Sequence, residues 1–370
     1  MLPSLDRPDL YERFDPARMR DHLPQMAAQC REAAAATKPL SLPSRYRHTT
    51  SVVVAGMGTS GLAGEMASDL LHHLGVPCPL TVWRDYGLPA WAGEKTLVVA
   101  CSYSGNTAET LSAYQSGIQR GAGVVPLTSG GELARRAGEC GVAPVAIPSQ
   151  WGGRHSIAAA LVTLLGVLRA AGHAPDLDDQ VDEAAFLIDR QSLRFGLATP
   201  EAENPAKALA RRLWGRVPLV YGAGLLTGVA RRWQYDINEN AKAWAVTATW
   251  PELQHNAVSG YRYPSTFRQD AYALILLSPL LRNVLRQRAP VTEALLRSSG
   301  VAGEKVEADG ELVGGRGLGP LAHQLGMVYL GSWASYYLAL LYGVDPVANE
   351  ALDIVRRSVA SLPHEPSNSP

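Results

Sequence analysis

The stretch SVVVAGMGTSG, residues 51–61, joins a short apolar run to a glycine-rich turn that opens a helix-like segment. A second stretch of the same kind, TLVVACSYSGNT, covers residues 96–107. Short apolar strands that alternate with helices are typical of a parallel sheet covered on both faces. Ligands on such sheets bind beyond the carboxyl ends of the strands, where both turns are expected. The two stretches therefore predict an α/β fold with a binding site at the ends of adjacent strands.

The side chains of the two turns indicate which ligand this edge of the sheet would hold. Backbone N–H groups at a helix N-terminus point outward, and the helix dipole favours negative charge there. Hydroxyl donors are added by Ser60, Ser102, Ser104 and Thr107. Together these groups predict a site for a phosphate monoester. The plainer interpretation is that both are ordinary Gly/Ser turns that cap helices.

The first turn also matches a different motif. Gly56, Gly58 and Gly61 satisfy the G-x-G-x-x-G pattern of dinucleotide-binding folds. That interpretation needs an acidic residue at the end of the next strand to hold the ribose, and Asp85 has the required place in the sequence. It leaves the hydroxyl-rich second turn without a function, so the phosphate site is favoured.

Composition excludes several classes of protein. The chain of 370 residues is long enough for two domains, and its 34 basic and 34 acidic residues cancel, which disfavours a nucleic-acid partner. The four cysteines show no C-x-x-C spacing, which favours a reduced cytoplasmic setting without a zinc site. The most apolar long segment, 158–171, is too short to cross a bilayer. A soluble cytoplasmic protein is therefore expected.

The pattern of apolar runs predicts two α/β halves, the second a weaker repeat of the first. An N-terminal domain with the phosphate-binding turns is assigned to 1–185, a C-terminal domain with the catalytic residues to 200–362, and a flexible tail to 363–370. An amphipathic helix is predicted over 15–36. Strands are predicted at 51–55, 79–83, 96–101, 123–127, 143–147, 217–221, 244–249 and 273–278. Helices are predicted at 60–74, 106–120, 131–138, 156–171, 180–197, 225–242, 284–298, 318–341 and 348–362.

The second half carries a candidate general base. Glu239 lies between two asparagines near the end of a helix, at the expected mouth of the second sheet, and a carboxylate held by amides can be poised as a base. His255 follows in a polar loop, where acid and base groups often lie. Two alternatives stay open at this point. Glu239 can pair with Lys242 at i+3 on the helix surface, and Glu252 is a rival base on the same loop as His255.

Four motifs taken together resemble one known family. They are GMGTSG at 56–61, SYSGNT at 102–107, NENAK at 238–242 and PELQHN at 251–256. This combination is similar to the bifunctional phosphoglucose/phosphomannose isomerases of the sugar isomerase (SIS) superfamily. The resemblance implies two SIS domains per chain and a homodimer whose active site is completed by the partner subunit. It implies glucose 6-phosphate and mannose 6-phosphate as substrates, both interconverted with fructose 6-phosphate, without metal or organic cofactor.

The resemblance also implies roles for particular residues. Glu239 would move a proton between C2 and C1 through a cis-enediol, and His255 of the other subunit would assist ring opening. Arg154 would stabilise the enediolate, as a fixed cation beside a developing oxyanion should. The phosphate would be held by Gly58, Thr59, Ser60, Ser102, Ser104 and Thr107.

The sequence departs from the family pattern at several positions. Thr59 stands where the family usually has glycine, Gly153 where it has proline, and Val347 where it has a substrate-contacting threonine. The family's C-terminal ring-opening lysine is missing, because no lysine follows Lys305. Arg356 is the positional substitute, yet arginine stays protonated and cannot shuttle a proton as lysine can. A non-catalytic or divergent sugar-phosphate-binding SIS protein is therefore the alternative prediction.

Overall fold

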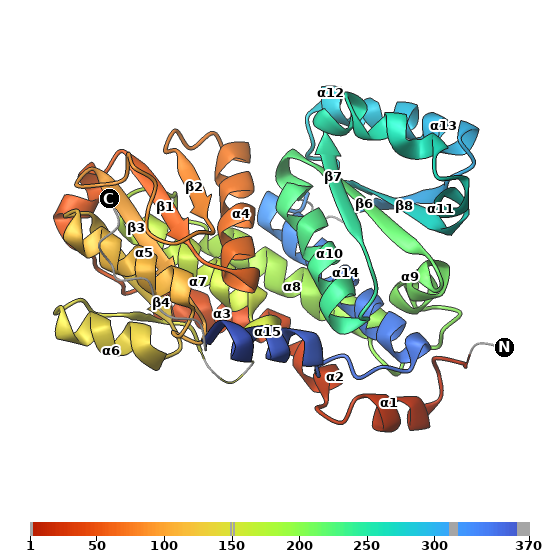
Figure 1. Cartoon of the computed structure of the whole chain (residues 1–370), viewed down its shortest axis with the longest axis horizontal. Helices are drawn as coiled ribbons and strands as arrows, with labels where there is room; N and C mark the ends of the chain where they lie inside the picture. Colours follow the sequence, from red (N-terminus) through yellow and green to blue (C-terminus); the bar gives the residue numbers. More distant parts are fainter. Residues whose placement is uncertain (1–2, 149, 151, 311–316, 361–370) are drawn as a thin grey trace.

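Two parallel sheets organise the chain in the computed structural model, which describes residues 3–148, 150, 152–310 and 317–360 (Figure 1). The first sheet has the strand order β2-β1-β3-β4-β5 and the second has the order β7-β6-β8-β9. Every strand pairing in both sheets is parallel. The predicted α/β class with two helix-flanked parallel sheets is confirmed.

The first sheet follows the predicted alternation of strands and helices closely. Its apolar strands are buried because helices cover both faces. The strands are β1 (Ser51–Ala55), β2 (Leu80–Trp83), β3 (Thr96–Cys101), β4 (Gly123–Thr128) and β5 (Val145–Ala146). The helices that connect them are α4 (Gly58–His73), α5 (Ala108–Gln119) and α6 (Gly131–Glu139).

The second sheet contains one strand that the sequence did not predict. Strand β9 (Ala302–Glu307) has the polar sequence AGEKVE and lies at the sheet edge, where an apolar pattern is not required. The other strands are β6 (Val217–Ala223), β7 (Val246–Trp250) and β8 (Ala271–Leu277). Its helices are α9 (Pro205–Leu213), α10 (Thr227–Asn240), α11 (Ser265–Asp270), α12 (Asn283–Arg286) and α13 (Arg288–Ser298). The last two replace the single helix predicted at 284–298.

A layer of long helices joins the two halves. Helix α14 (Pro320–Tyr342) is buried over nearly its whole length, as an apolar helix must be, and packs against α8 (Asp178–Phe195). Helix α8 also packs against α3 (Met26–Thr37), which contacts α7 (Ile157–Ala170) of the first half. One continuous apolar core therefore runs through both halves, and the domain limits at 185 and 200 stay a prediction. The predicted tail 363–370 lies outside the described residues.

The N-terminal helix predicted over 15–36 is wrong in its first part. A separate helix, α1 (Pro8–Phe14), precedes it, and α2 (Met19–His22) is followed by a short 3-10 helix, Leu23–Gln25, before α3 begins. Pro24 has no backbone N–H to donate, so a single continuous helix is not formed. Asp15 stabilises the start of α2, because its carboxylate accepts from the Met19 backbone N–H at 2.6 Å and pairs with Arg20 at 3.1 Å.

The described residues include no helix that is both long and apolar enough to cross a membrane. Helix α15 (Glu350–Ala360) ends the described part of the chain. Between the two sheets, α4 and α10 contact each other in the centre of the molecule (Figure 1). These two helices position the candidate site.

Candidate active site

The two predicted turns lie side by side at the carboxyl ends of β1 and β3. The strands are neighbours, with Ala55 opposite Ala100, so both turns leave the same edge of the sheet. Gly56 permits this approach, since a Cβ there would lie 2.7 Å from the carbonyl oxygen of Cys101. Helix α4 begins at Gly58 and α5 at Ala108, each within two residues of its predicted start. The N-termini of two helices therefore lie at the same edge of the sheet, and backbone N–H groups at such ends favour an anion.

The hydroxyls of the two turns are partly organised in the ligand-free chain. Ser60 and Ser102 are buried, Thr107 is half-buried and Ser104 is exposed. The Oγ of Ser102 lies 2.9 Å from the Oγ1 of Thr107 and accepts from the Gly105 N–H at 3.1 Å. The structure thus brings the predicted phosphate-binding residues together in two adjacent turns.

The candidate base and the candidate cation are in direct contact. Arg154 lies on a short 3-10 helix, Gly153–His155, in the first half of the chain, and Glu239 lies in the last turn of α10 in the second half. The Nε of Arg154 is 2.8 Å from the Oε2 of Glu239. Both side chains stay partly exposed, at 19% and 28%. The pair is therefore formed between the two halves and remains open to a ligand.

The segment before α15 completes the surroundings of Arg154. Its Nη1 donates to the carbonyl oxygens of Pro346 at 3.3 Å and Val347 at 3.1 Å. Val347, which the resemblance aligns with a substrate-contacting threonine, thus contributes its backbone here. Arg356 lies on α15, but its side chain is outside the described part of the structure, so its role as a lysine substitute stays a prediction.

Lys242 does not pair with the Glu239 carboxylate, and that alternative is wrong. Its ammonium instead donates to the carbonyl oxygens of Glu239 at 2.9 Å, Asn240 at 3.2 Å and Asp345 at 2.5 Å. A cation at a helix C-terminus stabilises the free carbonyls and the dipole. Burial, and then the charge of Arg154, lower the pKa of Lys242 to about 8. Lys242 therefore fastens the end of α10 to the segment that holds Arg154.

The two asparagines beside Glu239 do not hold its carboxylate, although the sequence had suggested that they would. The Oδ1 of Asn238 accepts from the Ala245 N–H at 3.1 Å, and the Nδ2 of Asn240 donates to the Oγ of Ser335 at 3.0 Å. Successive residues on a helix point to different faces, so neither amide reaches the carboxylate between them. They anchor the end of α10, and Arg154 is the partner that holds Glu239.

His255 and Glu239 lie at opposite ends of β7 within one chain. Helix α10 connects two parallel strands and so runs against them, which places Glu239 beside the amino end of β7. His255 is exposed in the loop after the carboxyl end of that strand. Strand β7 alone spans about 16 Å at roughly 3.3 Å per residue. The expectation that Glu239 lies at the mouth of the second sheet is therefore wrong, because the helix direction puts it at the other edge.

Glu252 remains with His255 in the loop after β7. Its Oε1 accepts from the Nδ2 of Asn256 at 2.8 Å, so this carboxylate orients its own loop. It lies at the opposite end of β7 from Glu239 and its partner Arg154. The geometry therefore favours Glu239 over Glu252 as the carboxylate beside the phosphate turns.

A buried charge network under the site escaped the sequence argument. Arg232 and Asp236 on α10 form an ion pair at 2.7 Å, with side chains only 4% and 2% exposed. Asp236 also accepts from the Oγ of Ser332 at 2.9 Å. In the sequence, the only sign of this buried ion pair is the i,i+4 spacing of Arg232 and Asp236 in the helix that carries Glu239. Such pairs are ordinarily exposed, which is why this one carried no expectation.

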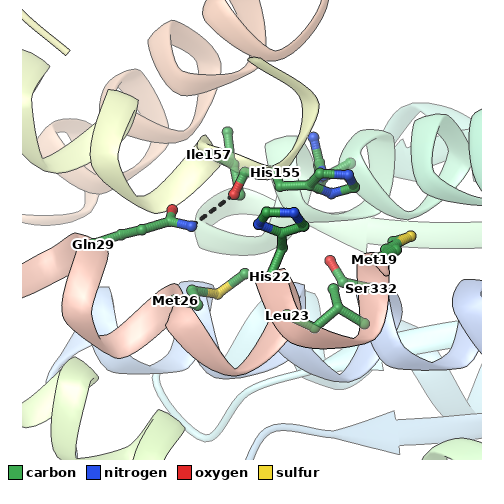
Figure 2. Close-up of a pocket in the computed structure, with 9 residues that line it drawn as sticks. Met19, His22, Leu23, Met26, Gln29, His155, Ile157 and Ser332 are labelled. Atoms are coloured by element: carbon green, nitrogen blue, oxygen red, sulfur yellow. Dashed lines mark hydrogen bonds between the residues drawn. The ribbon is translucent and has the colours of Figure 1, made fainter. Parts of the chain in front are cut away.

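Figure 2 shows a small pocket beside this network, in which the ring of His155 stacks on that of His22. The ring centroids are 5.7 Å apart and the planes differ by 2°. The backbone carbonyl of His155 accepts from the Nε2 of Gln29 at 2.8 Å. Burial, followed by the charges of Arg232 and Arg154, lowers the pKa of His155 to about 3. The imidazole next to Arg154 is therefore neutral in the folded protein at neutral pH.

We expect His155 to make the folded state less stable as the pH falls below about 6.5, the ordinary pKa of histidine. Between that pH and about 3, the unfolded chain binds a proton that the folded chain excludes. The slope from this one group approaches about 1.4 kcal/mol per pH unit. Urea unfolding at pH 7, 6 and 5 should show a shallower pH dependence for His155→Gln than for the unmodified protein. The exposed His48→Gln serves as control, and equal slopes for all three proteins would contradict the expectation.

Comparison with known proteins gives the class of protein that carries this arrangement. Residues 202–359 match the model of the bacterial phospho-glucose isomerase C-terminal SIS domain. The crystal structure of a hypothetical protein from Thermus thermophilus superposes with a TM-score of 0.71 at 19% identity, covering 96% of this chain and 94% of that one. The fold is thus that of the SIS superfamily of phosphosugar isomerases.

Two relatives narrow the class to a family. The bifunctional phosphoglucose/phosphomannose isomerase of Caldicellulosiruptor bescii is 31% identical over 338 residues, which cover 90% of this chain and 96% of the relative. The enzyme of the same name from Aquifex aeolicus is 32% identical over 308 residues, covering 83% and 90%. The chain belongs to the bifunctional phosphoglucose/phosphomannose isomerase family, and the resemblance seen in its motifs is confirmed.

Proposed function

We propose that the protein is an aldose–ketose isomerase that interconverts glucose 6-phosphate and mannose 6-phosphate with fructose 6-phosphate. The observation that carries this proposal is the contact of 2.8 Å between Glu239 of the second half and Arg154 of the first half, which also contains the two adjacent turns after β1 and β3. The names of the relatives support the substrates. The reaction is a proton transfer between neighbouring carbons through a cis-enediol.

In this proposal the first half of the chain holds the phosphate and Glu239 carries the proton. The two turns bind the phosphate through amides and hydroxyls of Gly58, Thr59, Ser60, Ser102, Ser104 and Thr107. The carboxylate of Glu239 takes the proton from C2 of the open-chain sugar, and the negative charge passes to the sugar oxygen. It then returns the proton to C1, while the proton of the C2 hydroxyl passes to the C1 oxygen, so that C2 becomes the ketone carbon and C1 the alcohol carbon.

Arg154 can balance the charge at each stage of that cycle. Its guanidinium is paired with ionised Glu239 in the ligand-free chain. When Glu239 accepts the proton it becomes neutral, and the charge appears on the enediolate beside it. A fixed cation that does not lose its own proton stabilises this oxyanion without further rearrangement. The carbonyls of Pro346 and Val347 keep the cation in place throughout.

We assign ring opening to His255 of the second protomer of a homodimer, as the family resemblance implies. Support comes from the position of His255, exposed on a loop at the far end of β7 from Glu239. The missing C-terminal lysine is the argument for the alternative, a divergent protein of this family that binds sugar phosphates without turnover.

The decisive assay couples fructose 6-phosphate formation to a detection enzyme, starting from glucose 6-phosphate and from mannose 6-phosphate separately. The proposal expects turnover of both substrates. Binding of both sugar phosphates by calorimetry, without any turnover, would establish the binding-protein alternative.

We expect the double variant Ser104→Ala/Thr107→Ala to weaken sugar-phosphate binding at least tenfold, about 1.4 kcal/mol. Ser104 lies in the turn before α5 and Thr107 is the N-cap residue, so the two substitutions remove two hydroxyl donors, and with Thr107 its 2.9 Å contact to the Oγ of Ser102. Titration calorimetry with glucose 6-phosphate measures the effect. Ser298→Ala, on the exposed surface of α13, is the matched control. Unchanged affinity of the double variant would place the phosphate elsewhere.

A further inference from the structure

Arg232 is a buried cation whose contacts connect three parts of the site. Its Nε and Nη2 bind Asp236, at 3.1 Å to Oδ2 and 2.7 Å to Oδ1. Its Nη1 donates to the Oγ1 of Thr59 at 3.2 Å, in the first phosphate turn. Its Nη2 also donates to the backbone carbonyl of Arg154 at 3.0 Å. One guanidinium therefore joins the phosphate turn, the segment of Arg154 and the helix of Glu239.

If Arg232 only stabilised the fold, it would need only some of these contacts. A buried arginine needs a counterion, and Asp236 on the same helix already supplies one. Neutralising the charge does not explain why the other N–H groups reach across to Thr59 and Arg154, on separate segments of the first half. The planar guanidinium holds its donors in a fixed fork, so a shift of one partner changes the geometry of the others.

We propose that Arg232 is a positioning residue that couples occupation of the phosphate turns to the alignment of Glu239 and Arg154. This inference rests on the proposed function. A bound phosphate accepts a hydrogen bond from the Thr59 hydroxyl, while the oxygen of that hydroxyl continues to accept a hydrogen bond from Arg232. The turn and the guanidinium are then held as a single unit. Through the carbonyl of Arg154, and through Asp236 one turn before Glu239, that unit fixes both catalytic groups.

Substitution of Thr59 tests this coupling directly. The Thr59 hydroxyl is the group of the first turn that accepts from the Nη1 of Arg232, at 3.2 Å. Thr59→Val removes the hydroxyl at constant shape, and Thr59→Ser keeps it. Thr247→Val is the matched control, because the Oγ1 of Thr247 donates to Gln234 on the outer side of the same helix at 3.2 Å.

The first test separates kcat from affinity. We expect Thr59→Val to lower kcat about tenfold, while the Kd for sorbitol 6-phosphate, which cannot isomerise, rises only about threefold, as the loss of one hydroxyl donor to the phosphate implies. Thr59→Ser should restore kcat, and Thr247→Val should leave both values unchanged. In an Arg232→Lys background the Thr59→Val substitution should have no further effect on kcat. A higher Kd with unchanged kcat, or no recovery in Thr59→Ser, would overturn the coupling and leave Thr59 as a plain phosphate ligand.

The second test does not depend on turnover. Sorbitol 6-phosphate should slow hydrogen exchange of the backbone amides in 236–242 of the unmodified protein and of Thr247→Val, and this slowing should be lost in Thr59→Val. If the protein binds sorbitol 6-phosphate but isomerises no sugar, the proposed function is refuted. The exchange measurement still tests whether Arg232 couples the phosphate turn to Glu239. Equal slowing in Thr59→Val refutes the coupling alone. Absence of any binding refutes both.

Discussion

Glu239→Gln is expected to lower isomerase turnover by about two to four orders of magnitude, the usual loss for a general base. Isomerisation between C1 and C2 needs one group that removes a proton from one carbon and returns it to the next on the same face. A single carboxylate does this because its two oxygens reach both carbons. Glutamine keeps the size and the oxygen that faces Arg154 at 2.8 Å but has no basicity.

The effect should appear in kcat and leave binding nearly unchanged. The phosphate turns lie on β1 and β3, and Glu239 makes no contact with their hydroxyls among the described residues. Calorimetry with sorbitol 6-phosphate should therefore give a Kd within about threefold of the unmodified protein. A large rise in Kd would indicate that the substitution disturbs Arg154 as well.

Glu252→Gln is the matched control for this experiment. Among the described residues, the carboxylate of Glu252 accepts from Asn256 within its own loop, so its substitution by glutamine should leave turnover within about fivefold. If Glu252→Gln loses turnover and Glu239→Gln keeps it, the base is Glu252 and the geometry around Arg154 has another purpose.

The parts of the site that the sequence predicted are those set by local patterns. An apolar run followed by a Gly/Ser turn and a helix is a local signal, and it predicted that the turns carrying Ser60 and Ser102 follow strands of one parallel sheet. Register between β1 and β3 follows from the parallel pairing of two buried strands. Such features need no knowledge of the rest of the chain.

The contacts of Glu239 could not be predicted, because they depend on how the two halves pack. Its partner, Arg154, lies on the other half of the chain, and the direction of α10 determines which edge of the second sheet the carboxylate approaches. The neighbouring asparagines suggested hydrogen bonds to the carboxylate, but a helix turns successive side chains apart. Arg232 was missed for the same reason, since its burial is a tertiary property.

A mixture of inactive Glu239→Gln and His255→Ala proteins is expected to recover activity after their subunits exchange. The prediction follows from β7, which separates Glu239 from His255 of the same chain by its own length. If each site takes Glu239 from one protomer and His255 from the other, a mixed dimer contains one intact site and one site with both defects. Random exchange of equal amounts should restore about a quarter of the original activity in a two-fold symmetric dimer.

The controls for this experiment decide between a shared site and a site within one chain. A mixture of Glu239→Gln with Arg154→Met should stay inactive, because both residues of that pair belong to the same site and the same chain. Exchange is verified by mass spectrometry of differently tagged subunits. Confirmed exchange with no recovered activity would show that His255 is not supplied by the partner. Recovery in the first mixture and not in the second would place the ring-opening histidine of each site on the opposite protomer, as we propose.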